Sequence, residues 1–290
     1  MPYEGPRVYR RDELTYNRYL RVEELLQLQQ PQSDPAHHDE MLFIIIHQSY
    51  ELWFKQIIHE MESCIRAMLA HKVLPAYRRL TRIIKIMQVL VNQIHILETM
   101  APIDFLQFRE KLNPASGFQS IQFREVEFLA GLGNEKLMGV FLNWPEYRDT
   151  LQRRLDGPTL RSAYYDLMRA YKYRIPEKVG REPDDKEREQ ILDALRELYQ
   201  HPNQKLPVYF LSEALIEFDE YLVLWRQHHV LVVERVIGGR KGTGGSSGVK
   251  YLESTTSKRC FPLLWEARTY LTKEPQWEAE EAEGAEVTDL

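Results

Sequence analysis

Cysteine is scarce in this chain of 290 residues, which contains only Cys64 and Cys260. Two cysteines cannot build the disulfide framework of a small secreted protein, and these two also lack the paired spacing of a zinc finger. The composition is otherwise that of a globular protein with a hydrophobic core, because 43% of the residues are hydrophobic and 28% are charged.

Long hydrophobic runs and an excess of positive charge are missing as well. No run approaches the roughly 18 apolar residues of a membrane-spanning helix, and Met1–Arg11 has no apolar signal-peptide core. The net charge is −5, but residues 276–290 carry six acidic side chains and no basic one. The rest of the chain is therefore close to neutral, so neither nucleic acid nor an anionic membrane is expected as a partner. A reducing cytoplasm is the simplest compartment.

Several common catalytic motifs are absent. The chain has no HExxH zinc motif, no pair of Glu-x-x-His sequences for a di-iron site and no GxSxG nucleophile elbow. The glycine-rich segment 238–248 lacks the GxxxxGK[ST] pattern of a phosphate-binding loop and follows a predicted helix rather than a strand. These absences argue against zinc peptidases, di-iron enzymes, serine hydrolases and P-loop proteins.

Apolar residues recur with helical periodicity along most of the chain. Proline, glycine and polar clusters separate these stretches, and no strand pair or hairpin signal appears. The sequence therefore predicts an all-α fold, a helical bundle with one mobile, glycine-rich loop at residues 238–248. The expected helices are Leu14–Gln30, His38–Ala70, Pro75–Thr99, Ile103–Leu112, Gln119–Leu129, Glu135–Leu142, Pro145–Leu155, Pro158–Tyr173, Glu187–Gln200, Leu206–Val236 and Phe261–Leu271.

A single domain is expected to span residues 1–275, followed by a disordered acidic tail at residues 276–290. The polar segment Ile175–Glu187 shows no core pattern and is expected to be a surface excursion. Pro158 is expected to lie in the first turn of its helix, where a missing N–H costs nothing.

The stretch His38–Phe54 is apolar almost all round a helix, which is typical of a core helix. Within it, His47 shares a face with Phe43 and Tyr50. Burial favours a neutral imidazole, so this face could hold a flat aromatic ligand and offer it a hydrogen bond. The alternative, and the more common situation, is a core histidine bonded to a backbone carbonyl.

A pair of histidines, His228 and His229, lies deep in the apolar helix Leu206–Val236. Adjacent side chains point about 100° apart on a helix, so both cannot serve one centre. His229 shares a face with Trp225, and a neutral imidazole among large apolar groups suits an axial ligand of haem iron. An ordinary core histidine is the alternative for His229, whereas His228 is expected to be structural or interfacial.

Two further features could bind a substrate. The glycine-rich loop carries Lys241 and Thr243 just after the candidate ligand helix, so it could close over a bound molecule; a flexible linker is the alternative. Arg109 follows Phe105 on a short helix, and an arginine beside aromatic rings can clamp a carboxylate through two parallel hydrogen bonds. A surface salt bridge is the alternative for Arg109.

Four blocks of the sequence stand out: HDEMLFIIIHQSYELWFKQI, FREKLNPASGFQSIQFRE, WRQHHVLVVERVIG and GTGGSSGVKYL. Taken together, they resemble the tryptophan 2,3-dioxygenase family. The matching blocks come in the family's order between about Tyr16 and Leu252, so the resemblance covers most of the chain. PASGFQS and GTGGSSG, at this order and separation, are highly specific.

The resemblance implies an enzyme that opens the indole pyrrole ring of L-tryptophan with O₂. The product is N-formyl-L-kynurenine, and the reaction is the first step of the kynurenine pathway. The resemblance also implies one noncovalently bound haem b per subunit, and a cytoplasmic homotetramer arranged as a dimer of dimers.

The resemblance further implies roles for individual residues. His229 takes the place of the proximal haem ligand, and His47 that of the distal histidine, the expected catalytic residue, which hydrogen-bonds the indole N–H. Phe43 is expected to pack on the indole ring. Arg109 is expected to pair with the substrate carboxylate.

Other positions are expected to complete the pocket. Phe105 and Leu112 are expected to form its walls, with Ser116 and Gly117 near the haem and Ser116 also near the substrate amino group. Thr243 is expected to contact the substrate ammonium and carboxylate groups.

Tyr16 and Tyr19 resemble the family's N-terminal tyrosines, so the segment 1–30 is expected to reach a neighbouring subunit's site. An indoleamine 2,3-dioxygenase-like enzyme with broader substrates is one alternative, but the distal histidine and these tyrosines argue against it. A haem sensor or carrier is another, but it would not need the amino-acid contacts expected of Arg109 and Thr243.

Overall fold

The computed structural model describes residues 9–10, 12–179, 182–245 and 247–272. Every regular element within these residues is a helix, and no strand occurs among them, so the predicted all-α fold is confirmed. The expected acidic tail at residues 276–290 lies outside the described residues, as do residues 1–8 of the N-terminal segment.

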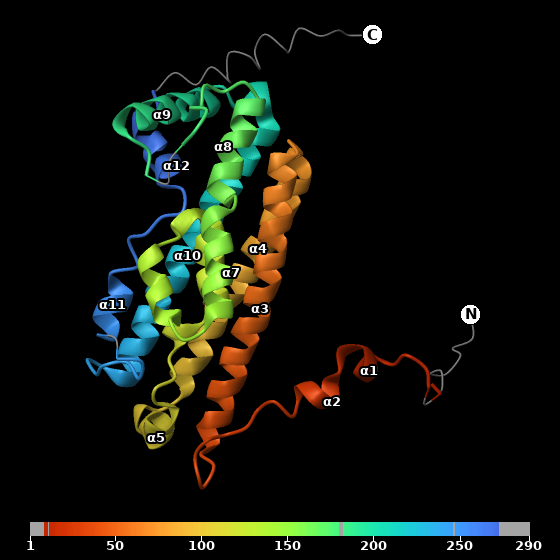
Figure 1. The fold of residues 1–290 in the computed structure, drawn as a ribbon, viewed down its shortest axis with the longest axis vertical. Coiled ribbons are helices and arrows are strands. Elements are labelled where there is room, and N and C mark those ends of the chain that lie inside the picture. The colour runs from red at the N-terminus through yellow and green to blue at the C-terminus, as the bar shows by residue number, and fades with distance from the viewer. Residues whose placement is uncertain (1–8, 11, 180–181, 246, 273–290) are drawn as a thin grey trace, which may run out of the picture.

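Three long helices form the centre of the molecule (Figure 1). They are α3 (His38–Leu69), α4 (Val73–Gln93) and α10 (Leu206–Ile237), and α4 packs against both of the others. Helix α8 (Leu160–Ala170) packs on α3. Each long helix contributes fully buried side chains, such as Ile57, Leu80 and Phe218, to one continuous core.

Shorter elements close the two ends and one side of this centre (Figure 1). Several of them are single turns of 3-10 helix, and η4 is a π-helical turn. They are η1 (Ile94–Thr99), α5 (Pro102–Arg109), η2 (Glu110–Leu112), η3 (Gly117–Gln119), α6 (Ile121–Glu127), η4 (Phe128–Leu132), η5 (Glu135–Phe141), α7 (Pro145–Asp156), α9 (Asp185–Gln200), η6 (Pro202–Lys205), α11 (Val249–Glu253), α12 (Pro262–Ala267) and η7 (Arg268–Tyr270).

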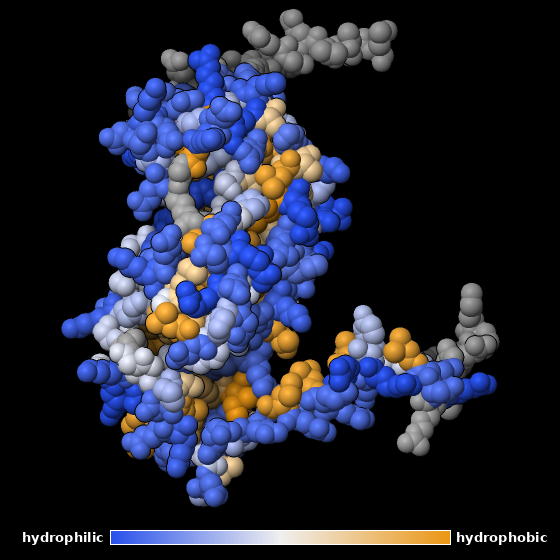
Figure 2. Space-filling model, viewed as in Figure 1, coloured by the Kyte–Doolittle hydropathy of each residue, from blue (hydrophilic) through white to orange (hydrophobic). Residues whose placement is uncertain are grey.

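The expected helix Leu14–Gln30 is wrong as a single element. The structure has two short helices, α1 (Tyr16–Leu20) and α2 (Val22–Leu25), separated by Arg21 in a left-handed backbone conformation with φ of 53°. Residues 12–30 form an arm that projects from the body (Figure 1), and most of its apolar side chains are exposed (Figure 2). Short helices gain most of their stability from packing, and this arm has no core of its own to pack on.

Helix α3 matches the expected helix in length but is not buried all round. Its apolar residues Met41, Ile45, Leu52 and Trp53 are exposed. A helix in a bundle buries only the face that meets its neighbours, and α3 is covered by α4 and α8 on part of its surface. The prediction of a helix buried on every side is therefore wrong, although the helix itself is confirmed.

Two smaller expectations also need correction. Helix α8 begins at Leu160, after Pro158, because the Thr159 hydroxyl accepts a hydrogen bond from the Ser162 N–H at 3.1 Å and caps the helix. The segment from Ile175 begins inside the protein, where Ile175 is only 6% exposed. It becomes a surface connection only after that residue. No helix in the described part of the chain is long and apolar enough to cross a membrane.

Candidate active site

A cavity of about 290 Å³ lies between the two long helices α3 and α10. Helices α5 and α6 border it, and the glycine-rich loop with α11 forms a further wall. Its lining is mainly aromatic and aliphatic, with a few polar groups, which is the usual composition of a small-molecule site. His47 on α3 and His229 on α10 both line it.

His229 is one of two polar side chains that α10 contributes to the cavity lining, the other being Arg226. Its ring packs against the indole of Trp225, with ring centroids 5.2 Å apart. Burial, together with a smaller effect of the nearby His47, lowers the pKa of His229 to about 4. The imidazole is therefore neutral near pH 7 and can offer a nitrogen lone pair to a metal.

His47 is oriented by its own helix. Its Nδ1 lies 2.7 Å from the backbone carbonyl oxygen of Phe43. A carbonyl oxygen only accepts hydrogen bonds, so Nδ1 carries the proton and Nε2 is left as an acceptor. The exposed surface of His47 faces the cavity rather than bulk water, and desolvation by the surrounding protein lowers its pKa.

Aromatic rings enclose the space next to His47. The ring of Phe43 is 4.1 Å from the His47 ring and 5.6 Å from that of Phe105, measured between centroids. Phe105 lies on α5, one turn before Arg109. Residues four apart share a helix face, so the two side chains point in similar directions. Helix α5 thus brings an aromatic ring and a guanidinium group to the same cavity.

The glycine-rich loop is docked against the segment that follows α5. Arg109 donates a hydrogen bond from Nη2 to the backbone carbonyl oxygen of Lys241, and the Thr243 hydroxyl donates to the carbonyl oxygen of Ala115 at 2.6 Å. Gly244 approaches Ser116 so closely that an added Cβ would lie 2.6 Å from the Ser116 Cβ. The loop sequence therefore needs glycine here to reach this position.

Most of the predicted site residues meet at this cavity, and three do not. Leu112 packs against the core but is outside the cavity lining. Tyr16 and Tyr19 are exposed on the arm, at 75% and 73%. The residues that line the cavity as predicted are Phe43, His47, Phe105, Arg109, Ser116, Gly117, Thr243 and His229.

His228, next to His229, takes part in a different contact. Its Nδ1 lies 2.9 Å from Nε2 of His95, and the other ring nitrogen of His95 lies 3.3 Å from a Glu98 carboxylate oxygen. This polar chain links α10 to η1 outside the cavity lining. It agrees with the structural role expected of His228.

A charged group in the same cavity was not predicted from the sequence. Arg124 and Glu127 on α6 and Arg226 on α10 are nine-tenths or more buried and line its wall, and Tyr251 on α11 lines it too. One signal was available, because Arg226 is the single Asp, Glu, Lys or Arg between Glu220 and Glu234 of its helix. The pairing of Arg226 with α6 depends on the tertiary fold and could not be foreseen.

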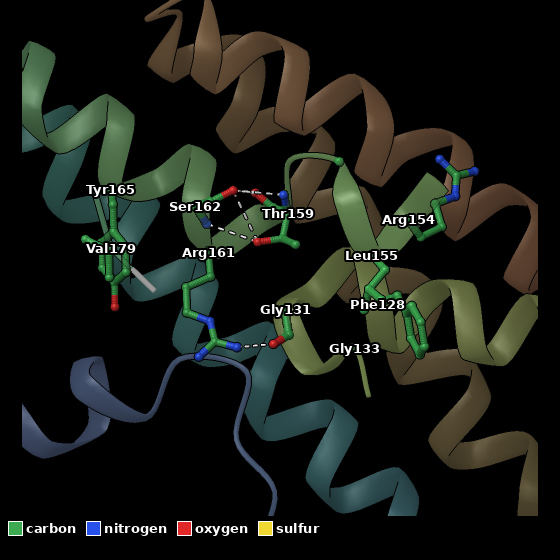
Figure 3. A pocket seen from close by; sticks show the side chains of 11 residues that line it. Phe128, Gly131, Gly133, Arg154, Leu155, Thr159, Arg161, Ser162, Tyr165 and Val179 are labelled. Atoms are coloured by element: carbon green, nitrogen blue, oxygen red, sulfur yellow. Dashed lines mark hydrogen bonds between the residues drawn. The ribbon is translucent and has the colours of Figure 1, made fainter. Parts of the chain in front are cut away.

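A second, smaller cavity of about 120 Å³ lies beside the start of α8 (Figure 3). Four of its polar side chains already have partners in the protein. Arg161 donates to the carbonyl oxygen of Gly131, Thr159 and Ser162 cap each other's backbone, and Arg154 pairs with two glutamates. This cavity is therefore a space between helices rather than a second candidate active site.

Comparisons with known proteins identify the family. A sequence model of the family described as tryptophan 2,3-dioxygenase matches residues 4–208 and 197–271. The chain belongs to the tryptophan 2,3-dioxygenase family. Relatives named tryptophan 2,3-dioxygenase include one from Nocardioides sp., 43% identical over 89% of this chain and 95% of the relative. One from Caulobacter vibrioides is 40% identical over 89% and 99%, and one from Myxococcus xanthus is 38% identical over 90% and 91%.

The cavity suits the haem on which tryptophan 2,3-dioxygenases depend. No group of three or more His, Cys, Asp or Glu side chains in the described residues could hold a bare metal ion. A single neutral imidazole facing an apolar space instead fits iron whose other ligands come from a macrocycle. The residues present therefore fit a haem, with His229 as the side chain that would hold its iron.

Proposed function

We propose that this chain opens the indole pyrrole ring of L-tryptophan with O₂ and forms N-formyl-L-kynurenine, the first step of the kynurenine pathway. The observation that carries the proposal is the shared cavity, where His229 and His47 stand on facing helices and Arg109 lies at one end. Family membership supports it, because the relatives are named for this reaction. The proposed cofactor is one haem b per subunit.

His229 is the proposed axial ligand of the haem iron. When bound, the haem supplies a binding site for O₂ and the redox chemistry of the reaction. The contribution of His229 is a nitrogen lone pair, which its low pKa keeps free of a proton at neutral pH. The Trp225 ring, packed on the imidazole, restricts its rotation.

His47 is the proposed distal catalytic residue. Because its Nδ1–H is bonded to the Phe43 carbonyl, its Nε2 can accept a hydrogen bond from an indole N–H. A neutral imidazole is too weak a base to remove that proton readily, so His47 acts by holding and orienting the ring. Phe43 and Phe105 would pack on the indole and exclude water from it.

The amino-acid end of the substrate is assigned to a separate group of residues. Arg109 has five N–H donors, so it can bind a carboxylate while it also contacts the loop. Thr243 and Ser116 provide hydroxyl groups beside it for the ammonium and carboxylate groups, and Ser116 and Gly117 also border the haem space. Leu112 supports this wall from behind, because it packs against the core next to the lining residues.

The proposed assembly is a cytoplasmic homotetramer, a dimer of dimers, with one domain at residues 1–275 in each subunit. Tyr16 and Tyr19 would enter a neighbouring subunit's site. The apolar side chains of the arm support this proposal, because most of them are not covered by the described residues of their own subunit. L-Tryptophan and O₂ are the proposed small-molecule partners, and no nucleic acid or membrane partner is proposed.

The decisive experiment mixes reduced, haem-loaded protein with L-tryptophan in air and follows the absorbance of N-formylkynurenine. Product should appear without a continuous supply of reductant, because the indole ring provides the electrons. Replacing His229 by Ala should remove stable haem binding and the Soret band. A normal Soret band in His229→Ala would overturn the ligand assignment, and turnover of D-tryptophan or tryptamine as fast as L-tryptophan would overturn the substrate assignment.

A further inference from the structure

A buried charge cluster on the cavity wall is not used by the mechanism above. Glu127 on α6 is only 4% exposed and is bonded to two arginines. Arg124, one turn earlier on α6, donates to one of its carboxylate oxygens, and Arg226 on α10 donates to the other at 2.8 Å. Arg124 and Arg226 are 6% and 3% exposed, so all three charges are shielded from water.

This cluster carries one positive charge in excess, because two guanidinium groups share one carboxylate. The other acidic side chain on the cavity lining, Glu51 on α3, accepts a hydrogen bond from Gln122 on α6. A buried charge without a counter-charge is costly. An anion bound in the cavity would balance the cluster.

Arg124 is the member of the cluster with unused hydrogen-bonding capacity. Its Nε is buried and has no hydrogen-bond partner of acceptable geometry among the described residues. Its guanidinium carbon lies 4.8 Å from the centroid of the Phe118 ring and 5.4 Å from that of Phe123, so the group is held in place by aromatic faces. Arg124 also lines the cavity. Because its Nε is closed off from solvent, a ligand there would be bound by the terminal nitrogens of the guanidinium group.

Arg124 and Arg109 have different partners in the protein. Phe123, beside Arg124, is 4.9 Å from Trp225, whose ring is 5.2 Å from His229. Arg109 instead contacts the glycine-rich loop and follows Phe105, which packs towards His47. Arg124 is therefore a second cationic group on the cavity lining, in addition to Arg109.

Tyr251 on α11 completes the surroundings of Arg124. Its ring packs edge-on against Phe118, with centroids 5.1 Å apart. Burial raises the pKa of the Tyr251 hydroxyl, an effect that the positive charge of Arg124 partly offsets, so the two groups are close together. The hydroxyl keeps its proton at neutral pH and can donate it in a hydrogen bond.

We propose that Arg124, with Tyr251 as a second donor, binds a propionate carboxylate at the edge of the haem, an assignment that rests on the proposed function. A guanidinium group matches a carboxylate in charge and geometry. The macrocycle would then be held at two points, its iron by His229 and its acidic edge by Arg124. Arg226 and Glu127 act as positioning residues, because they fix the direction of the Arg124 side chain.

The test compares haem b with its dimethyl ester, in which both propionates are uncharged, in the full-length protein. The rate of haem transfer to an excess of apomyoglobin is measured for wild type and for Arg124→Gln. In wild type, the ester should leave about 10- to 100-fold faster than haem b. In Arg124→Gln, haem b should leave about 10- to 100-fold faster than from wild type, and esterification should have little further effect.

Two control variants make each outcome decisive. Arg154→Gln removes an ion-paired arginine that lies outside this cavity and pairs with two glutamates. Its rate of haem transfer should therefore match that of wild type. Arg124→Lys should give an intermediate rate because it keeps the charge. If Arg124→Gln does not fold, as judged by circular dichroism, Arg124→Lys and the wild-type comparison still decide the question.

Equal transfer rates for haem b and its ester in wild type would overturn the proposal. It would also be overturned if esterification accelerated haem transfer by the same factor in wild type and in both Arg124 variants. Failure of the proposed function looks different, because the protein would then bind no haem or would form no N-formylkynurenine. Wild-type turnover of L-tryptophan combined with no dependence on the propionates would refute only the role of Arg124.

Discussion

At the scale of single residues, the cavity holds two neutral histidines with different free atoms. Nδ1–H of His47 donates a hydrogen bond to the backbone carbonyl oxygen of Phe43, which leaves Nε2 as a hydrogen-bond acceptor. His229 is neutral for another reason, because it is surrounded by protein on α10 and packed against Trp225. One residue type can therefore serve as a hydrogen-bond acceptor on one wall and as a metal ligand on the other.

The low pKa of His229 predicts a pH dependence of stability in the haem-free protein. An unfolded histidine titrates near pH 6.5, whereas His229 in the folded protein titrates near pH 4. Between these values the unfolded chain binds the additional proton, so the free energy of unfolding should fall as the pH is lowered from about 6.5 to 4, by up to about 3 kcal/mol. The free energy of unfolding is measured with denaturant at several pH values for wild type and for His229→Gln. The difference between the two pH profiles gives the contribution of His229. Parallel pH profiles for the two proteins would show that His229 is not the cause.

Arg109 should matter for substrates that carry a carboxylate. Arg109→Ala removes charge-assisted hydrogen bonds worth about 1.5–3 kcal/mol, so L-tryptophan should bind about 10- to 100-fold more weakly. Tryptamine has no carboxylate and should bind almost equally well to both proteins. Spectral titration of the haem-loaded protein gives both affinities. Arg235→Ala is a matched control, because this arginine is largely exposed and pairs with Glu98 away from the cavity. An equal loss of affinity for L-tryptophan and tryptamine would show that Arg109 does not bind the substrate carboxylate.

At the scale of elements, the cavity lies between packed helices and a loop docked against them. Helices α3 and α10 both pack against α4, so the core sets the positions of His47 and His229. Among the described residues, the glycine-rich loop is held by the hydrogen bonds of Arg109 and Thr243 and by the fit of Gly244 against Ser116. The mobility predicted for this loop requires that these contacts break and re-form at a small cost in free energy.

Gly244→Ala tests the importance of the docked loop. The new Cβ would lie 2.6 Å from that of Ser116, so the loop must shift, at a cost of about 1–3 kcal/mol. The KM for L-tryptophan should rise about fivefold or more, while the Soret band stays unchanged. Gly239→Ala is the control, because a Cβ there meets nothing within 4 Å.

Hydrogen exchange gives a second measurement of the same loop. In wild type, exchange in residues 238–248 should slow when L-tryptophan is added, whereas in Gly244→Ala it should stay fast. Unchanged exchange in wild type on addition of substrate would contradict the predicted ordering of the loop.

At the scale of the whole molecule, the arm is the feature that a single subunit leaves unexplained. Leu14, Tyr16 and Tyr19 are more than 70% exposed, although all three are large apolar or aromatic residues. The first turns of α3, which follow the arm in the chain, also expose Met41 and Ile45. Contiguous apolar surface of this kind commonly marks a contact with another protein, and the proposed partner is a second copy of this chain.

Mixed oligomers can test whether the arm completes a neighbour's site. A chain with Tyr16→Ala and Tyr19→Ala should be nearly inactive in its own oligomer but should keep an intact haem cavity. A chain with His229→Ala is inactive but has a normal arm. Co-assembly of the two should restore activity, because the arm of the second chain can enter the site of the first. A mixture no more active than its separate components would mean that each arm serves its own subunit or none.

The sequence by itself determined the helical fold, the approximate helix limits and most of the site. Helical periodicity follows from the 3.6-residue turn, so α3, α4 and α10 could be foreseen from their apolar patterns. His47, Arg109 and His229 could be foreseen because they are polar groups in apolar or aromatic surroundings, within blocks characteristic of the family. The N-terminal cap of α8 was harder to foresee. Pro158 was expected inside this helix, but the Thr159 cap makes the helix start at Leu160.

Tertiary structure alone decided which faces are buried and which distant residues meet. Periodicity reports the composition of a helix but not the number of its neighbours, so α3 was expected to be buried all round although it is covered only in part. The single helix expected at Leu14–Gln30 is broken because no core supports it. The pairing of Glu127 with Arg226 joins residues 99 positions apart. Such a contact depends on how α6 meets α10, which no local pattern in the sequence encodes.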